Sequence, residues 1–279
     1  MRRERLWRGL AAGAGLAAVV GAGLRRRRVL RRARTYADRV CEDAEVVGGS
    51  YDPAEVTDLP APVRRYFEAV LEPGQRHVRT AELAQSGTIR LGGAGSEWHP
   101  FGATQVYSVA PPGYAWSARV ALLPLVSARV LDAYANGEGV LRADLGGIVP
   151  VARAGPDPRT NEAQLQRYLA ETPWFPTALL PAAGVEWEGV DDRTARATLT
   201  DGDTAAAVTF HFEGDRVRRV TADRYRQETG DEGVWVGEYD SYEERDGLTI
   251  PTEAEVAWGT DEGRVPYWRG QVVDADYRY

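Results

Sequence analysis

The sequence predicts an α+β protein built on one large, curved antiparallel sheet, and three observations lead to this fold class. From Thr80 onward, apolar residues alternate with polar ones, which is typical of half-buried strands. The breaks between these segments are short turn sequences, so successive strands should pair antiparallel in a meander. One segment, residues 158–182, lacks the alternation and is predicted to be a helical insert. About a dozen strands in one sheet must twist and curl, which gives a half-barrel roofed by a helical lid.

Five strands are expected before the insert and seven after it. The first five are Thr80–Leu91, Trp98–Ala110, Tyr114–Leu122, Ser127–Tyr134 and Gly139–Leu145. The later seven are Val185–Val190, Thr194–Thr200, Ala205–Glu213, Arg216–Tyr225, Gly233–Tyr242, Leu248–Ala257 and Val265–Tyr277. Turn sequences such as NGEG, TDGD, EGD and RDG separate them.

The insert is predicted from its helical spacing and from the prolines that end it. Apolar residues recur at i, i+3 and i+4, at Leu165, Tyr168 and Leu169. Helix-breaking prolines follow at Pro173, Pro176 and Pro181. Between them Trp174 and Phe175 carry too much apolar surface to leave in water, at about 1.5–3 kcal/mol for each buried side chain. The insert should therefore pack onto one face of the sheet.

Residues 1–28 are predicted to be a membrane anchor with basic flanks. Gly9 to Leu24 are sixteen uninterrupted residues of Gly, Ala, Val and Leu, and Arg25–Arg28 end the run where a signal peptide would have a cleavage site. Sixteen residues are short against the roughly 20 needed to span a bilayer, so an uncleaved interfacial helix is the alternative. Seven arginines follow the run and four precede it, which favours the soluble domain of a single-pass protein on the cytoplasmic side. The opposite insertion, with the domain outside the cell, is the alternative.

Residues 29–58 are predicted to be an amphipathic helix and linker, followed by the β-rich half-barrel domain at 59–279. Apolar residues from Val29 to Val47 recur every three to four positions, and Gly48-Gly49 ends the pattern. A second short helix is expected at LPAPVRRYFEAVL, with proline in its first turn.

Charge and cysteine content limit the partners. Residues 1–39 hold 12 arginines and two acidic residues, whereas the rest holds 22 arginines and 39 acidic residues. An acidic domain on a basic tail argues against nucleic-acid binding and favours contact of the tail with anionic membrane lipid. The single cysteine, Cys41, excludes an intramolecular disulfide and a cysteine-rich zinc site.

Several strings together resemble an uncharacterised prokaryotic family that is known only as a domain of unknown function. They are LPAPVRRY, WHPFGATQVYSVAPPGYAW, RYLAETPWFPTALLPAAGVEWE, ATLTD and PYWRG, and the resemblance covers about residues 59–279. That family implies a membrane anchor followed by this domain but no catalytic residue. The meander with a helical lid is also similar to the lipoprotein-carrier fold, which implies an apolar ligand in the half-barrel.

The side chains expected to line a ligand site between sheet and lid are Trp116, Arg119, Tyr168, Trp174, Phe175 and Tyr239. Arg119 is expected on the same strand face as Trp116, where it could bind an anionic head group. Arg167 and Glu171 are expected to form a surface pair at i, i+4. No catalytic residue, metal site or cofactor is predicted, because the histidines are widely separated and no serine lies in a G-x-S-x-G elbow.

Three functions stay open at this point. The preferred one is a membrane-tethered module that holds a lipid or other apolar ligand between sheet and lid. The second is a hydrolytic enzyme that acts on a membrane-associated substrate. The third is a structural partner domain whose core is filled and which binds no ligand.

Overall fold

The computed structural model describes residues 27–92, 95–226, 229–261 and 263–279. The apolar run on which the predicted anchor depends, residues 9–24, lies outside these ranges. Within them, no helix is both long and apolar enough to span a membrane. The anchor therefore stays a prediction from the sequence.

Thirteen strands follow one another along the chain. They are β1 (Thr80–Ile89), β2 (His99–Ser108), β3 (Gly113–Leu123), β4 (Val126–Ala135), β5 (Glu138–Leu145), β6 (Val149–Ala154), β7 (Glu186–Asp191), β8 (Thr194–Asp201), β9 (Thr204–Glu213), β10 (Arg216–Tyr225), β11 (Glu232–Arg245), β12 (Leu248–Thr260) and β13 (Gly263–Arg278). The predicted strands correspond to all of these except β6. The sequence pattern misses β6 because two glycines precede it and Pro150 interrupts its alternation.

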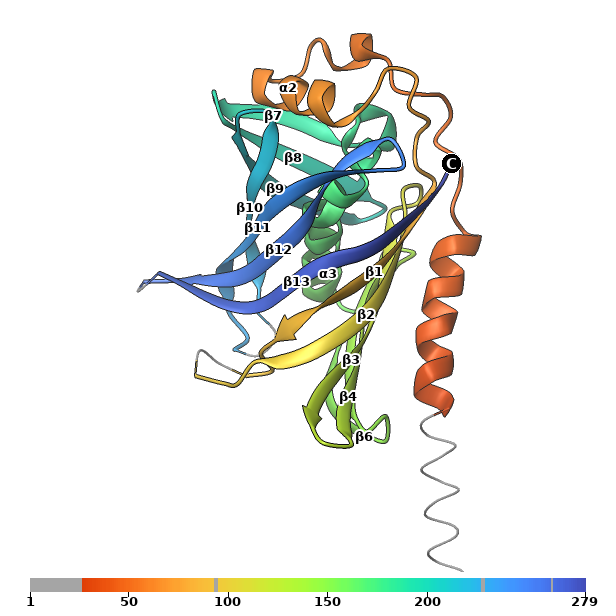
Figure 1. Ribbon diagram of the computed structural model, residues 1–279, viewed down its shortest axis with the longest axis vertical. Helices are drawn as coiled ribbons and strands as arrows, with labels where there is room; N and C mark the ends of the chain where they lie inside the picture. Colours follow the sequence, from red (N-terminus) through yellow and green to blue (C-terminus); the bar gives the residue numbers. More distant parts are fainter. Residues whose placement is uncertain (1–26, 93–94, 227–228, 262) are drawn as a thin grey trace, which may run out of the picture.

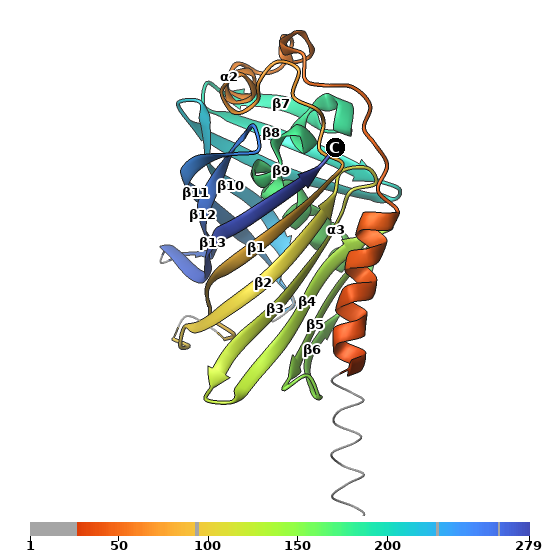
Figure 2. The ribbon, with the colours of Figure 1, turned by 45° about the vertical axis from the view of Figure 1, so that its right-hand side comes forward.

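All thirteen strands form a single antiparallel sheet in the order β6-β5-β4-β3-β2-β1-β13-β12-β11-β10-β9-β8-β7. Consecutive strands pair directly, as expected for a meander, except β6 and β7, between which the insert lies. The first and last strands, β1 and β13, pair with each other in the middle of the sheet. The register between them runs from Thr80 opposite Arg278 to Ile89 opposite Trp268. The two edges, β6 and β7, are the strands that flank the insert. The sheet curves around the insert, so the expected curved sheet is confirmed (Figures 1 and 2).

The insert consists of one helix and three short turns of 3₁₀ helix: α3 (Pro158–Glu171), η2 (Thr172–Trp174), η3 (Pro176–Leu179) and η4 (Pro181–Ala183). Asp157 caps α3, since its carboxylate accepts hydrogen bonds from the backbone nitrogen (3.1 Å) and the hydroxyl (2.6 Å) of Thr160. Pro158 occupies the first turn, where a missing N–H costs nothing. α3 lies on the inner face of the sheet and contacts β4 and β5 on one side and β9 and β10 on the other (Figure 1).

Two helical elements lie between residue 50 and the first strand: η1 (Pro53–Val56) and α2 (Ala61–Val70). The predicted helix at LPAPVRRYFEAVL corresponds to α2, which covers one end of the sheet (Figure 1). Its buried side chains Tyr66 and Phe67 contact the rings of Phe212 and Trp187, at centroid distances of 5.9 and 6.5 Å. α2 therefore closes one end of the core.

Residues 27–42 are helical and lie on the outer face of the sheet, opposite the insert (Figure 2). The helix ends earlier than the predicted pattern, which reaches Val47. Its residues Tyr36 and Val40 pack with Leu131 and Val140, which point outward from β4 and β5. The sheet is thus covered on both faces over β2 to β5.

Candidate functional site

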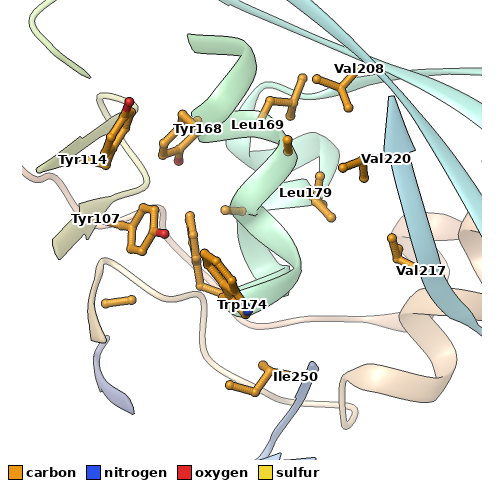
Figure 3. Packing of buried hydrophobic residues seen from close by; sticks show 14 of the residues in the cluster. Tyr107, Tyr114, Tyr168, Leu169, Trp174, Leu179, Val208, Val217, Val220 and Ile250 are labelled. Carbon is orange, nitrogen blue, oxygen red and sulfur yellow. The ribbon is translucent and has the colours of Figure 1, made fainter. Parts of the chain in front are cut away.

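The candidate site is the interface between the insert and the inner face of the sheet, and five of the six predicted ligand-binding residues lie there. Each of the five is at most 3% exposed: Trp116, Tyr168, Trp174, Phe175 and Tyr239. The Phe175 ring lies 4.4 Å from that of Tyr107 and 5.8 Å from that of Tyr168, measured between centroids. The Trp174 ring meets that of Tyr239 edge-on at 6.0 Å. Figure 3 shows how the side chains of Tyr107, Tyr168 and Trp174 gather around the insert.

The interface is filled by the protein's own side chains. The labelled residues of Figure 3 come from the insert and from strands on both sides of it, and they interdigitate in one apolar cluster. Two open hollows, of about 590 and 480 Å³, lie instead on the outer face of the sheet among charged side chains. The expected roomy pocket beneath the lid is therefore occupied by protein in this state.

Arg119 lies elsewhere, and its predicted placement beside Trp116 is wrong. The two residues are three positions apart on β3, and successive side chains of a strand point to opposite faces. Trp116 is 3% exposed on the inner face, whereas Arg119 is exposed on the outer face opposite Arg129. Arg119 cannot contact a ligand held between sheet and insert.

The cation that lies beside Trp116 at the interface is Arg167 of α3, and not Arg119. Its guanidinium forms ion pairs with Glu171 on the same helix (2.8 Å) and with Asp132 on β4. All three side chains are at most 14% exposed, so the predicted surface pair of Arg167 and Glu171 is in fact an interior one. The guanidinium also lies over the rings of Tyr114 (5.1 Å) and Trp116 (5.3 Å), a favourable cation–π geometry.

The first arm of this network runs from Glu171 into β2 and β1. The Glu171 carboxylate accepts hydrogen bonds from the amide of Gln105 (2.7 Å) and the hydroxyl of Tyr107 (2.9 Å). Gln85 donates to Gln105 (3.2 Å) and accepts a hydrogen bond from the indole N–H of Trp116 (2.9 Å). Each buried polar group on this arm has a partner, which offsets the cost of removing it from water.

The second arm runs from Asp132 to β10. Gln164 donates its amide hydrogen to Asp132, and its oxygen accepts from the hydroxyl of Tyr114 (2.5 Å) and from Arg224 (3.3 Å). Arg224 also donates to the backbone oxygen of Ala163 on α3 (2.9 Å). The network therefore links strands from both halves of the sheet through one helix.

The environment fixes the protonation state of three groups in the network. Burial acts to lower the pKa of Arg167, but the adjacent Glu171 above all raises it, and the pKa ends well above its ordinary value. Burial raises the pKa of Tyr107 well above its usual range, and the Glu171 carboxylate adds to this. Burial and then the Asp132 carboxylate do the same for Tyr114. Arg167 is thus always charged, and the two phenols are neutral hydrogen-bond donors.

Tyrosine hydroxyls fasten the insert to the sheet. Tyr168 donates to the backbone oxygen of Ser108 (3.0 Å), and Tyr239 donates to that of Ala170 (2.7 Å). Tyr277 donates to the backbone oxygen of Trp174 (2.7 Å). The indole nitrogen of Trp174 is itself buried and has no hydrogen-bond partner among the described residues.

Sequence reasoning misses the polar half of the site. Gln85, Gln105 and Asp132 alternate with apolar inward-facing residues on β1, β2 and β4, and this alternation was the available signal. A polar residue on a predicted inner face needs a partner, so these three positions could have been paired with the polar side of α3.

The remaining chemistry-bearing residues stay apart. Among the described residues, no group of three or more His, Cys, Asp or Glu is placed to hold a metal ion. His77 lies buried before β1, with Nε2 4.0 Å from a carboxylate oxygen of Glu55. His211 faces outward on β9 and contacts the Thr221 hydroxyl at 3.1 Å. Burial and then Arg219 lower the His211 pKa.

Comparison with known proteins gives a family and two distant structural likenesses. A LolA superfamily protein from Nitrosomonas europaea is 12% identical, with a TM-score of 0.38 over 78% of this chain and 92% of its own. A beta-barrel-like protein of a domain of unknown function, DUF1849, from Brucella abortus is 14% identical, with a TM-score of 0.27 over 73% of this chain and 99% of its own. No curated protein matches this chain. Residues 57–277 match a family of unknown function (DUF6920), as the sequence strings led us to expect, and the chain belongs to that family.

Proposed function

We propose that this protein is a membrane-tethered module that binds a lipid or another apolar ligand between the inner face of its sheet and the insert. The observation that carries the proposal is the surface beneath the insert, an apolar and aromatic face covered by a helix rather than by a second sheet. If the insert moved away, this face would be open along the curved sheet. The buried, unpartnered N–H of Trp174 would offer a hydrogen bond to a ligand oxygen there.

Binding requires displacement of the insert, because its side chains now fill the interface. The insert is joined to β6 and β7 through Gly155 and Gly184, both with positive φ (65° and 86°). Glycine adopts this conformation without strain, and such element-terminal positions can absorb a change in chain direction. An acyl chain would replace the apolar contacts of Trp174 and Phe175 with contacts of the same kind.

The tether in this proposal is the apolar run of residues 9–24 with its arginines on both sides. The arginine count on the two sides supports a single-pass orientation with residues 27–279 on the cytoplasmic side. Membrane lipid is then both the surface that holds the protein and a nearby source of ligand.

Native mass spectrometry of the detergent-extracted full chain tests the proposal. We expect a copurifying lipid mass that is lost in Trp174→Ala and retained in Trp268→Ala. Trp268 is the matched control because it is also a buried tryptophan on the inner face, with 8% exposure, but belongs to the sheet. Its ring contacts that of Phe101, with 5.6 Å between centroids. Equal retention in the two variants would count against a site beneath the insert.

A structural domain without a ligand is the second candidate, and a specific observation favours it. The interior is filled, and the charge of Arg167 is paired there with Asp132 and Glu171. A spectrum that contains only the mass of the polypeptide, under mild extraction, would support this candidate over the first.

A further inference from the structure

Two neighbouring hairpins end in exposed apolar tips. The first tip, residues 122–126, is the β3–β4 turn with the strand ends beside it, and the second, residues 145–151, is the β5–β6 turn with the strand ends beside it. Neither the stretch 120–128 nor the stretch 145–152 contains a charged residue. Leu123 is 68% exposed, Leu125 is fully exposed, and Val149 and Val151 are 52% and 59% exposed. Such a gathering of large apolar side chains on a surface marks an interaction site.

Other turns of the same sheet have the opposite composition. The β8–β9, β9–β10 and β11–β12 connections have the sequences TDGD, EGD and RDG, in which each turn carries at least one aspartate or glutamate. These polar turns are what a sheet needs where its hairpins face water. The two hairpin tips therefore carry large apolar side chains where other turns of the sheet carry charged ones. A turn does not need such side chains for its own geometry.

The hairpin tips lie at the end of the molecule where the N-terminal helix begins. Both ribbon views show the tips and the start of helix 27–42 pointing in the same direction (Figures 1 and 2). Val29 and Leu30 of this helix line one small hollow together with Arg129 and Leu131 of β4, so the helix start is seated beside these strands. The chain that precedes residue 27 contains the apolar run 9–24, and it joins the described residues at this end.

Four arginines lie on the outer face of β3 to β6, close to the tips. On β3 to β6, Arg119 lies directly opposite Arg129, and Arg142 lies directly opposite Arg153. Like charges in cross-strand pairs are unfavourable. Asp144 lies directly opposite Arg129 on the other side, so Arg129 has a carboxylate beside it within the sheet.

The N-terminal helix adds to the same charge. Its first two turns carry Arg27, Arg28, Arg31 and Arg32 without an acidic residue. Together with Arg119, Arg142 and Arg153 of the strands they form an arginine belt. Arg119 and Arg142 lie three residues from the nearer tip and Arg153 lies two, or roughly 7–10 Å at about 3.3 Å per residue. Interfacial segments bury their apolar side chains to a similar depth, about 5–10 Å into the boundary between headgroups and acyl chains.

We propose that the two hairpin tips insert into the outer hydrocarbon of an anionic bilayer while the arginine belt binds the lipid phosphates. The inference rests on the membrane tethering proposed above and adds a second, independent contact that orients the sheet on the membrane. The tether and the tips lie at one end of the molecule, so both reach the same surface. α2 then lies at the end away from the bilayer.

The test uses the full chain with Cys41→Ser as the background, reconstituted into vesicles of phosphatidylcholine and phosphatidylglycerol. An environment-sensitive fluorophore is attached to Leu125→Cys, Val149→Cys or Val190→Cys. Val190 is the matched control because it is also a large apolar residue with 59% exposure, but on β7 near α2. We expect a blue shift and quenching by spin-labelled lipid acyl chains at positions 125 and 149, and water-like emission at 190.

Flotation of the same samples separates this proposal from the tether. If the protein floats with the vesicles and all three probes report water, the tether stands and the tip insertion is wrong. If the protein does not float, both are wrong. A further variant, Arg119→Gln with Arg153→Gln, should reduce the blue shift at position 125 at least twofold in anionic vesicles. An unchanged shift would refute the role of the arginine belt.

Discussion

Substitution of Arg167 by methionine gives the sharpest test of the buried network. Methionine keeps most of the side-chain volume but removes the charge that Asp132 and Glu171 share, and both carboxylates are only 9% exposed. Removing one partner of a buried ion pair costs about 3–5 kcal/mol, because it leaves a buried charge uncompensated. The total free energy of unfolding of a protein is about 5–15 kcal/mol, so this cost is a large fraction of it. We expect the Tm of the variant to fall by roughly 10 °C.

The assay is urea and thermal unfolding of the detergent-solubilised chain, followed by circular dichroism. Arg245→Met is the matched control, because Arg245 pairs with Glu243 at 2.6 Å but is 41% exposed. Exposed pairs contribute about 0–1 kcal/mol. A loss of 1 kcal/mol or less in Arg167→Met, equal to that of the control, would refute the reasoning that the network is buried and coupled.

A compensating variant provides a second readout of the same network. Without the cation of Arg167, two carboxylates stay buried without a partner of opposite charge. Adding Glu171→Gln and Asp132→Asn to the variant should recover much of the loss at neutral pH.

Four other substitutions test the packing and the electrostatics. Gly270→Ala should lower the free energy of unfolding by about 1–3 kcal/mol, because its Cβ would lie 2.4 Å from the ring of Trp268. Tyr66→Phe should leave stability unchanged or raise it, since the Tyr66 hydroxyl is buried without a hydrogen-bond partner in the described part of the chain. Tyr239→Phe should cost about 1–2 kcal/mol, because a backbone carbonyl of the insert loses its donor; equal effects of the two tyrosine variants would contradict this. The lowered pKa of His211 means that stability present above about pH 6.5 is lost as pH falls through that pKa, so His211→Gln should flatten the dependence of Tm on pH between about 7 and 5.

Most of the secondary structure depends on local sequence and was therefore predictable. Period-two alternation and the Asp- and Gly-rich turns predict the strands, and the prolines after Tyr168 predict a broken helix. The opposite orientation of Trp116 and Arg119 also follows from alternation alone, since an odd spacing leads to opposite faces. The prediction that Arg119 shares a face with Trp116 was wrong for this reason.

The interior of the site was not predictable in the same way. Arg167 and Glu171 at i, i+4 look the same in sequence whether the helix face is solvated or buried. Only the position of α3 on the inner face, beside Asp132 of β4, decides that the pair is buried.

The sequence by itself determined which residues form strands and turns, because backbone preference and alternation act over a few neighbouring residues. It also determined the apolar run at 9–24 and the family to which the chain belongs. Tertiary structure alone decided that β1 pairs with β13, that the insert fills the concave face, and that the two apolar hairpin tips lie at the same end of the molecule as the start of the N-terminal helix. These features join residues far apart in the chain, and only the curvature and registry of the complete sheet bring them together.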